Sequence, residues 1–270
     1  SQQKHFNVVT FQAEDEIAAV CAAVGASFAG SLGVTSSSGP GITLKGEAIS
    51  LASSTELPLV IINTQRGGPS TGLPTKTEQS DFNQALYGRH ADTMLPIVSA
   101  SSSVDCFDVA IEACRLAVQF MTPVILLSDG YMANASEPWL VPDITSYKPF
   151  PVNFEKEVEN FTPAKRDPET LARIWAKPGT PGLEHRIGGI EKDIDTGNIS
   201  YDSENHQAMT DLRERKIENI ANYIPKQTVS SGPETGKLAV VGWGSSYGAI
   251  HQAVRRCLQE NLDVAHIHVR

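Results

Sequence analysis

Cysteine is scarce in this sequence, and its spacing is wrong for metal chemistry. The four cysteines, at positions 21, 106, 114 and 257, form no C-x-x-C pair. Zinc and iron–sulfur sites use closely spaced cysteines, so a metal or cluster site built from this chain alone is not expected. Cys21 and Cys114 lie on apolar faces of predicted helices, and we expect both to be small core residues.

Basic residues and long apolar runs are also lacking. Lysine and arginine number 22 against 31 acidic residues, for a net charge of −9, and no basic cluster occurs. This argues against nucleic acid or an anionic membrane as a partner. No apolar run approaches the roughly 20 residues that span a bilayer, and no signal peptide opens the chain. We therefore expect a cytoplasmic protein with one large or two modest domains.

What the sequence does contain is a distinctive stretch near its start. Residues 7–11, NVVTF, are typical of a buried strand, and Glu14 follows them at the start of an Ala-rich segment with apolar residues at helical spacing. A second strand-like run, GVTSSS, ends in Gly39-Pro40-Gly41 before another helical segment. Ligands bind at such strand ends because nearby helix N-termini offer free N–H groups.

Each feature alone has an ordinary explanation. Glu14 could simply complement a helix dipole, and S-G-P-G could be a tight turn. Together, with 24 residues between Glu14 and Gly39, they resemble the pyrimidine-binding domain of thiamine diphosphate enzymes. The longer strings QAEDEIAA, TSSSGPG and LPLVIINTQRGGPSTGLPTKTEQSDF resemble the α subunit of 2-oxoacid:ferredoxin oxidoreductases, the 2-oxoglutarate branch in particular.

The resemblance assigns roles to particular residues. It implies that Glu14 is catalytic and hydrogen-bonds the cofactor's aminopyrimidine, which is the internal base of thiamine diphosphate. It implies that Arg66 and Thr75 bind the 2-oxoacid, a role that also suits a guanidinium fork beside hydroxyl groups. The cofactor-binding turn is expected to consist of Ser38, Gly39, Pro40 and Gly41.

The same resemblance implies partners. No G-D-G…N pattern for Mg²⁺ and diphosphate occurs, so Mg²⁺, the diphosphate site and an iron–sulfur cluster are expected on a β subunit. The complex would convert a 2-oxoacid and coenzyme A to acyl-CoA, with electrons passing to ferredoxin. Homodimeric pairing is also expected, because the small-residue helix from Ile17 to Gly30 should be left partly uncovered.

The expected fold class is α/β, with a doubly wound, mostly parallel sheet of the thiamine diphosphate-binding type. Residues 1–133 should form the pyrimidine-binding domain, without the first strand–helix unit that relatives carry. Residues 134–235, rich in proline, should be an irregular linker or arm with a polar helix over 204–223 whose charges face solvent. Residues 236–270 resemble the beginning of a transketolase C-terminal-like α/β domain.

Two other functions remain open from the residues. Gly242, Gly244 and Gly248 resemble a dinucleotide-binding loop, which would suit a nucleotide-dependent dehydrogenase, although the spacing is G-x-G-x-x-x-G and no acid follows for a ribose. A scaffolding or regulatory subunit could keep the fold without chemistry. His266 and His268 share a strand face, which favours a buried position over a metal pair.

Overall fold

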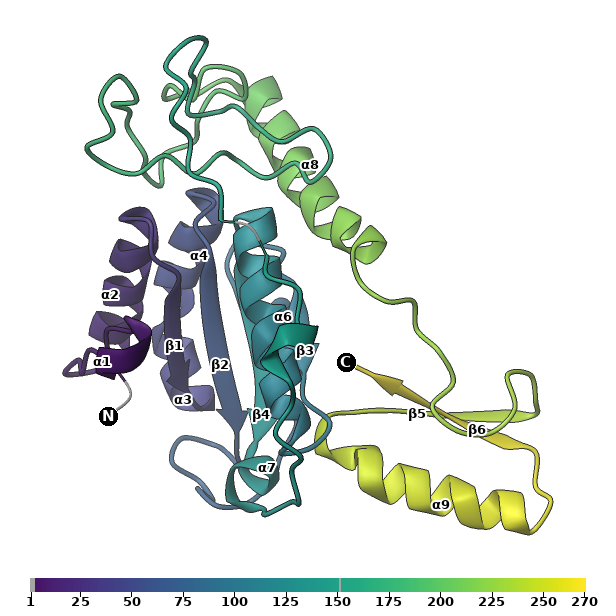
Figure 1. Cartoon of the computed structure of the whole chain (residues 1–270). Helices are drawn as coiled ribbons and strands as arrows, with labels where there is room; N and C mark the ends of the chain where they lie inside the picture. The colour runs from purple at the N-terminus through teal and green to yellow at the C-terminus, as the bar shows by residue number, and fades with distance from the viewer. Residues whose placement is uncertain (1–2, 151) are drawn as a thin grey trace.

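The computed structural model describes residues 3–150 and 152–270, and its centre is a parallel sheet with strand order β1-β2-β4-β3 (Figure 1). The four strands are β1 (Gly33–Ser37), β2 (Leu59–Gln65), β3 (Ile97–Ser99) and β4 (Pro123–Asp129). All four strands point the same way, so their carboxyl ends meet at one edge. The sequence-based prediction of a mostly parallel α/β sheet is confirmed.

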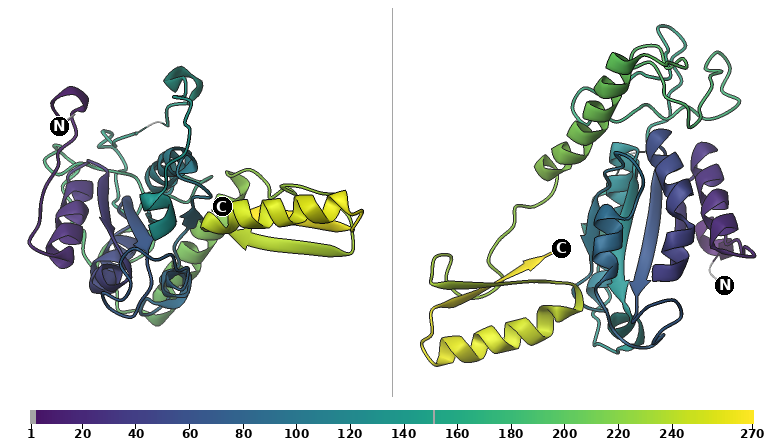
Figure 2. Two further views of the ribbon diagram at one scale, coloured as in Figure 1. Left: turned by 90° about the horizontal axis from the view of Figure 1, so that it is seen from below. Right: turned by 180° about the vertical axis from the view of Figure 1, so that it is seen from behind.

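Helices cover both faces of this sheet because its central strands are apolar on both sides. Leu59 and Ile61 of β2 pack with α2 and α4, whereas Val60 between them packs with α6. Successive side chains of a strand point to opposite faces, so a continuous apolar run needs a cover on each. Figure 2 shows the two helical layers from below and behind.

The helices surround the sheet and extend beyond it. They are α1 (Gln3–Phe6), α2 (Glu16–Phe28), α3 (Gly39–Leu44), α4 (Gly46–Ser54), α5 (Asp81–Tyr87), α6 (Asp105–Phe120), α7 (Gly130–Asn134), α8 (Ser203–Asn219) and α9 (Tyr247–Gln259). Short 3₁₀ turns occur at η1 (Ile144–Ser146), η2 (Ile220–Asn222) and η3 (Gly244–Ser246).

Two local predictions are wrong. Residues 7–11 form no strand, and Val8, Val9 and Phe11 are exposed. A strand there would need a hydrogen-bonded neighbour, but the ladder beside β1 is with β2 alone among the described residues. Cys21 is exposed rather than in the core, although Val20 beside it is fully buried.

The exposed side of α2 carries apolar residues. Ile17 is 49% exposed and Phe28 is 38% exposed. The expectation that this helix is left partly uncovered is therefore confirmed.

An irregular arm follows α7 and lies against the end of the sheet where β2 and β4 begin (Figure 1). Trp175 anchors it: its indole N–H donates to the backbone carbonyl of Ser27 over 3.1 Å, and its ring packs on Phe154. Helix α8 is less solvated than its charges suggest, because Met209, Leu212 and Lys216 are buried.

A second, two-stranded parallel sheet forms from β5 (Leu238–Trp243) and β6 (Val264–Val269), with α9 between them in sequence. His266 and His268 on β6 are buried, as predicted. The unit touches the first sheet where Gln79 donates to the carbonyl of Trp243 over 3.0 Å and where the Ser245 hydroxyl donates to Asp129.

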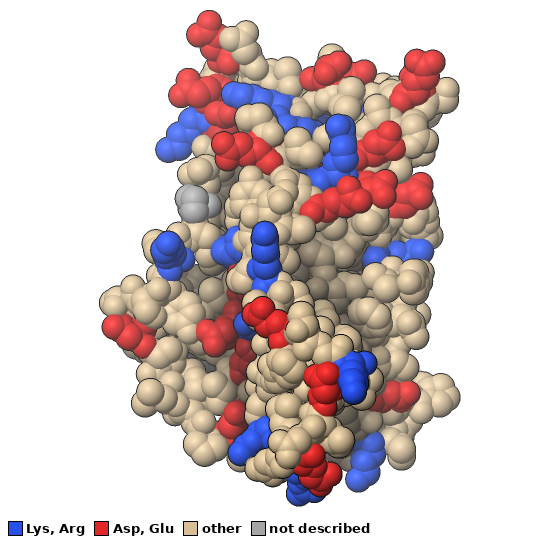
Figure 3. All heavy atoms as spheres, turned by 90° about the vertical axis from the view of Figure 1, so that its right-hand side faces the viewer, with Lys and Arg blue, Asp and Glu red and all other residues tan. Residues whose placement is uncertain are grey.

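Charge on the face shown in Figure 3 is mixed rather than gathered by sign. On the face in Figure 3, lysine and arginine side chains are interspersed with aspartate and glutamate from one end to the other. Within the described part of the chain, no helix has both the length and the apolarity to cross a bilayer. The same residues contain no cluster of three or more histidine, cysteine or acidic side chains arranged to hold a metal.

Candidate active site at the carboxyl edge of the first sheet

A corner built from the end of β1 and the starts of α2 and α3 places one carboxylate. Asp15 is the N-cap of α2, and its side chain accepts from the Ala18 N–H over 2.7 Å. Glu16 is therefore the first helical residue, and its Oε1 accepts a hydrogen bond from the Ser37 hydroxyl over 3.2 Å. The carboxylate is half-buried and lies at the carboxyl end of β1.

Gly41 is required at this corner. A Cβ on Gly41 would lie 2.0 Å from the Ser37 Oγ and 2.7 Å from the Glu16 Oε1, so both side chains would have to shift to admit it. The glycine lets the backbone of α3 lie directly against both groups, and the Glu16 carboxylate is approachable because it is only half-buried. A carboxylate in a glycine-walled corner suits a flat heterocycle that must come within hydrogen-bonding distance of it.

The structure does not bring Glu14 to this corner. Glu14 lies outside the helix, before the Asp15 cap, and is exposed. The sequence does hold a signal that separates the two acids of the E-D-E string. Aspartate is a preferred N-cap, so Asp15 as cap makes Glu16 the residue that turns with the helix into the site.

Lys45 stiffens the same corner and was not identified from the sequence. Its side chain is fully buried between α3 and α4, and its Nζ donates to the Thr35 hydroxyl over 2.8 Å and to the Glu16 carbonyl over 3.2 Å. Burial lowers the pKa of Lys45, against the opposing effect of Glu16 and then Asp15. Lys45 thereby connects β1 to the first turn of α2.

A cavity of about 370 Å³ opens beside this corner, lined by Ser36, Ser37, Ser38, Thr64, Arg66, Pro74, Gly130, Ala133 and Asn134. Ser38 is the N-cap residue of α3, but its hydroxyl makes no cap bond and instead accepts from the Arg66 Nε over 2.9 Å. The Arg66 Nη1 donates to the Thr71 carbonyl over 2.6 Å. These two bonds fix the guanidinium at the cavity wall.

Other predicted site residues lie close by, with one exception. Gly39, Pro40 and Gly41 form the first turn of α3. Thr75 is exposed in the loop after β2, and it is its neighbour Pro74, not Thr75, that lines the cavity. The structure thus brings Arg66 and Ser38 together and leaves Thr75 at the rim.

Asp81 is a second acid near the corner that the sequence did not single out. Its Oδ2 accepts from the Asn63 side chain over 3.1 Å, and both Asp81 carboxylate oxygens lie about 2.9 Å from the position of a Cβ on Gly39. Burial raises the pKa of Asp81, partly offset by the Asn63 hydrogen bond. The sequence signal for a polar contact at this position was Asn63, a polar residue inside the apolar strand β2.

These features define a class of protein: a parallel α/β domain whose carboxyl edge holds an approachable carboxylate, a glycine turn and a fixed arginine. The family model described as pyruvate flavodoxin/ferredoxin oxidoreductase, thiamine diphosphate-binding, matches residues 1–203. The chain belongs to this family.

Its similarity to individual relatives extends over the whole chain. It is 55% identical over 270 residues to the 2-oxoglutarate oxidoreductase subunit KorA of Mycobacterium tuberculosis, covering 100% of this chain and 41% of the relative. It is 34% identical over 242 residues to the 2-oxoglutarate synthase subunit KorA of Archaeoglobus fulgidus, covering 90% of this chain and 62% of the relative. The chain thus spans less than two thirds of these relatives.

A solved structure is also similar. The chain matches 2-oxoglutarate:ferredoxin oxidoreductase from Magnetococcus marinus, solved with 2-oxoglutarate, coenzyme A and succinyl-CoA bound, with a TM-score of 0.93 and 31% sequence identity. The match covers 99% of this chain and 46% of that one.

Proposed function

We propose that this chain is the pyrimidine-binding part of the α subunit of a thiamine diphosphate-dependent 2-oxoacid:ferredoxin oxidoreductase, acting in the cytoplasm. The reaction is oxidative decarboxylation of a 2-oxoacid with coenzyme A to acyl-CoA, with electrons passing to ferredoxin. The observation that carries the proposal is the Glu16–Ser37–Gly41 corner in a member of this family. The names of the M. tuberculosis, A. fulgidus and M. marinus proteins support 2-oxoglutarate as the substrate.

The residues present fit the pyrimidine half of thiamine diphosphate. The Glu16 carboxylate is half-buried beside the cavity lined by Ser37 and Ser38, and the first turn of α3 with Gly41 lies directly against it. When bound, thiamine diphosphate supplies the nucleophilic carbon and electron sink for decarboxylation. The contribution of this chain is a positioned carboxyl group that holds or releases a proton at a ring nitrogen of the pyrimidine.

We assign that carboxyl group to Glu16. The resemblance in the sequence had implied Glu14 instead. Glu16 is half-buried, bonded to Ser37 and held through its backbone carbonyl by Lys45. Glu14 is exposed and precedes the helix. General acid–base work requires a fixed geometry first, and only Glu16 of the two has it.

Arg66 is assigned to the substrate carboxylate. Its Nε and Nη1 are engaged by Ser38 and Thr71, which orients the remaining guanidinium edge without neutralising its charge. Such a charge-assisted contact contributes roughly 2–5 kcal/mol to binding when it is desolvated. Thr75 is proposed as a second contact; from its exposed place it would reach substrate only if the loop after β2 closes over the cavity.

The partners proposed are a β subunit, ferredoxin and a second copy of the chain. The β subunit would carry the diphosphate, Mg²⁺ and an iron–sulfur cluster. The exposed apolar side of α2, with Ile17 and Phe28, suits burial against protein.

The glycine turn after β5 gives no support to a dehydrogenase. A Cβ on Gly244 would lie 2.6 Å from the Gln79 side chain, and the adjacent Trp243 carbonyl accepts from the same amide. This turn therefore packs on the first sheet. A scaffolding role gains no support either, because a scaffold has no need for the fixed Glu16 and Arg66.

A matched pair of substitutions tests the proposal in the assembled enzyme. Glu16→Gln should lower turnover on the order of 10²–10⁴-fold while folding is unchanged. Glu14→Gln, the control, should leave turnover near normal. A fall only in Glu14→Gln would restore the assignment from sequence, and a fall in neither would refute this catalytic site. A panel of 2-oxoacids assayed with the unaltered enzyme identifies the substrate. Arg66→Ala should lower kcat/KM for each 2-oxoacid that is used, and an unchanged kcat/KM would refute the role of Arg66.

A further inference from the structure

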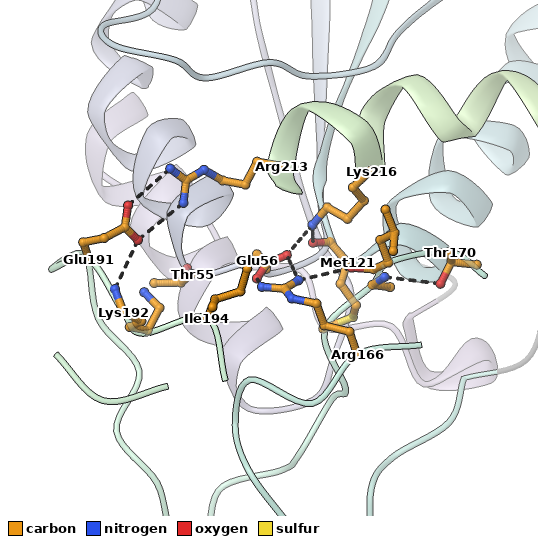
Figure 4. Close-up of polar contacts among 12 residues, drawn as sticks. Thr55, Glu56, Met121, Arg166, Thr170, Glu191, Lys192, Ile194, Arg213 and Lys216 are labelled. Carbon is orange, nitrogen blue, oxygen red and sulfur yellow. Dashed lines mark hydrogen bonds and ion pairs between the residues drawn. The ribbon is translucent and has the colours of Figure 1, made fainter. Parts of the chain in front are cut away.

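An ion cluster lies at the opposite end of the first sheet from the candidate active site. Glu56 follows α4 in the left-handed region, with φ of 51°, and its carboxylate is buried. Its two oxygens accept from the Nη1 and Nη2 of Arg166 in the arm over 2.6 and 2.5 Å, and Oε1 also accepts from the Lys216 Nζ of α8 over 2.6 Å (Figure 4).

The charges of this cluster do not balance. Arg173 of the arm is only 6% exposed, and its Nε has no hydrogen-bond partner among the residues that the structure describes. The Nε of Arg166 is likewise buried and unpartnered. Burial lowers the pKa of Arg173, yet a guanidinium keeps its proton in proteins. Even if Lys216 lost its proton, the buried guanidinium of Arg173 and the largely buried guanidinium of Arg166 would face the single fully buried carboxylate of Glu56.

A small cavity lies inside the cluster. It has a volume of about 20 Å³, and its charged lining residues are Glu56, Arg166, Arg173, Arg186, Lys192 and Asp193. The Asp193 carboxylate keeps its charge, because backbone N–H groups of Thr196 and Asp195 donate to its Oδ1 and lower its pKa. Four of these six charged lining residues are cations and two are anions, so the lining carries an excess of positive charge.

The size of the cavity selects the occupant. A volume of about 20 Å³ admits a single particle of the size of water. A water molecule fits but carries no charge, whereas buried charges in proteins are paired.

We propose that this cavity is a binding site for a small monatomic anion, namely chloride. The anion completes the charge balance between Arg166 and Arg173. By doing so it holds the arm, which supplies both arginines, to the end of α4 and to α8. This site is separate from the proposed catalytic corner, so its occupancy should be independent of cofactor and substrate.

Bromide tests the proposal because it replaces chloride and scatters anomalously. Crystals of the assembled protein grown in bromide should show an anomalous peak in this cavity. In solution, raising bromide at constant ionic strength against gluconate should slow hydrogen exchange of residues 163–199. At a bromide concentration ten times the dissociation constant, exchange through arm opening should be about tenfold slower.

Two variants complete the test. Arg173→Met should abolish both the peak and the bromide effect on exchange, whereas Arg215→Met, at an exposed arginine of α8, should change neither. If Arg173→Met does not fold, the anomalous peak and the bromide dependence of hydrogen exchange in the unaltered protein still test the proposal. A cavity that holds only water in bromide-grown crystals, with exchange insensitive to bromide, would overturn the proposal.

Discussion

Replacing Glu56 should be among the most destabilising single changes in this chain. Its carboxylate is about 1% exposed and is the acceptor for both Arg166 and Lys216. Glu56→Ala leaves those two cations buried without a partner. Removing one member of a buried ion pair costs about 3–5 kcal/mol, mostly as the penalty of the charge left behind.

The backbone at Glu56 gives a way to separate this electrostatic effect from local strain. A non-glycine residue in the left-handed region costs about 1–2 kcal/mol, and Glu56 has φ of 51°. Glu56→Gly loses the ion pairs but relieves that strain. It should therefore be about 1 kcal/mol more stable than Glu56→Ala while both fall well below the wild type.

Urea unfolding followed by tryptophan fluorescence measures both effects. At a slope of about 2 kcal/mol per molar urea, a loss of about 4 kcal/mol lowers the midpoint by about 2 M. Glu112→Ala is the control, because its pair with Arg115 is partly exposed on helix α6 and should contribute less than about 1 kcal/mol. A midpoint for Glu56→Ala that matches this control would refute the reasoning.

Three further outcomes are expected. Gly41→Ala should weaken thiamine diphosphate activation and lower turnover of the complex far more than it lowers stability, because the added Cβ would meet the Ser37 hydroxyl and the Glu16 carboxylate. A turnover equal to that of the wild type would contradict the proposed role of the Glu16–Ser37–Gly41 corner. Burial raises the pKa of Glu56, but Lys216 and Arg166 outweigh it and hold that pKa well below its usual range. The stability that ionised Glu56 contributes through Lys216 and Arg166 is thus complete above about pH 5. It should fall by up to about 1.4 kcal/mol per pH unit as the pH is lowered further. In Glu56→Gln, the free energy of unfolding should lack this dependence on pH. Calorimetry of this chain alone with thiamine diphosphate and Mg²⁺ should show weak or no binding, and a tight stoichiometric isotherm would contradict the proposed partner-borne diphosphate site.

The sequence predicted the parallel layers because their signals are local and strong. Residues 59–62 and 123–127 are continuous apolar runs, and amphipathic helices flank them. The placement of Arg66 and Ser38 at strand ends was also predictable, since each directly follows a strand. Parallel strands bring their carboxyl ends together, so the two side chains had to lie near one another.

The wrong prediction for residues 7–11 and the missed Glu56 cluster come from features that no local pattern decides. The NVVTF run has strand composition, but a strand forms only where a neighbour supplies hydrogen bonds. The assignment of the catalytic carboxyl group to Glu14 stays a prediction; our proposal of Glu16 instead rests on Asp15 being the N-cap of α2. The Glu56 cluster joins residues 110 and 160 positions apart, and their pairing depends on how the arm returns to the sheet.

The two ends of strand β2 connect the buried ion cluster to the proposed site. Glu56 lies three residues before Leu59, where β2 begins, and Arg66 follows Gln65, where it ends. The strand is rigid because it pairs with β1 and β4 on its two sides. Because the N-terminal end of β2 is held in place, the positions of Asn63 and Arg66 along the strand axis at the carboxyl edge are also held in place. Under our proposal that Arg66 binds the substrate carboxylate, a contact sensitive to misplacement, the cluster at the far end would support precision at the site without touching it.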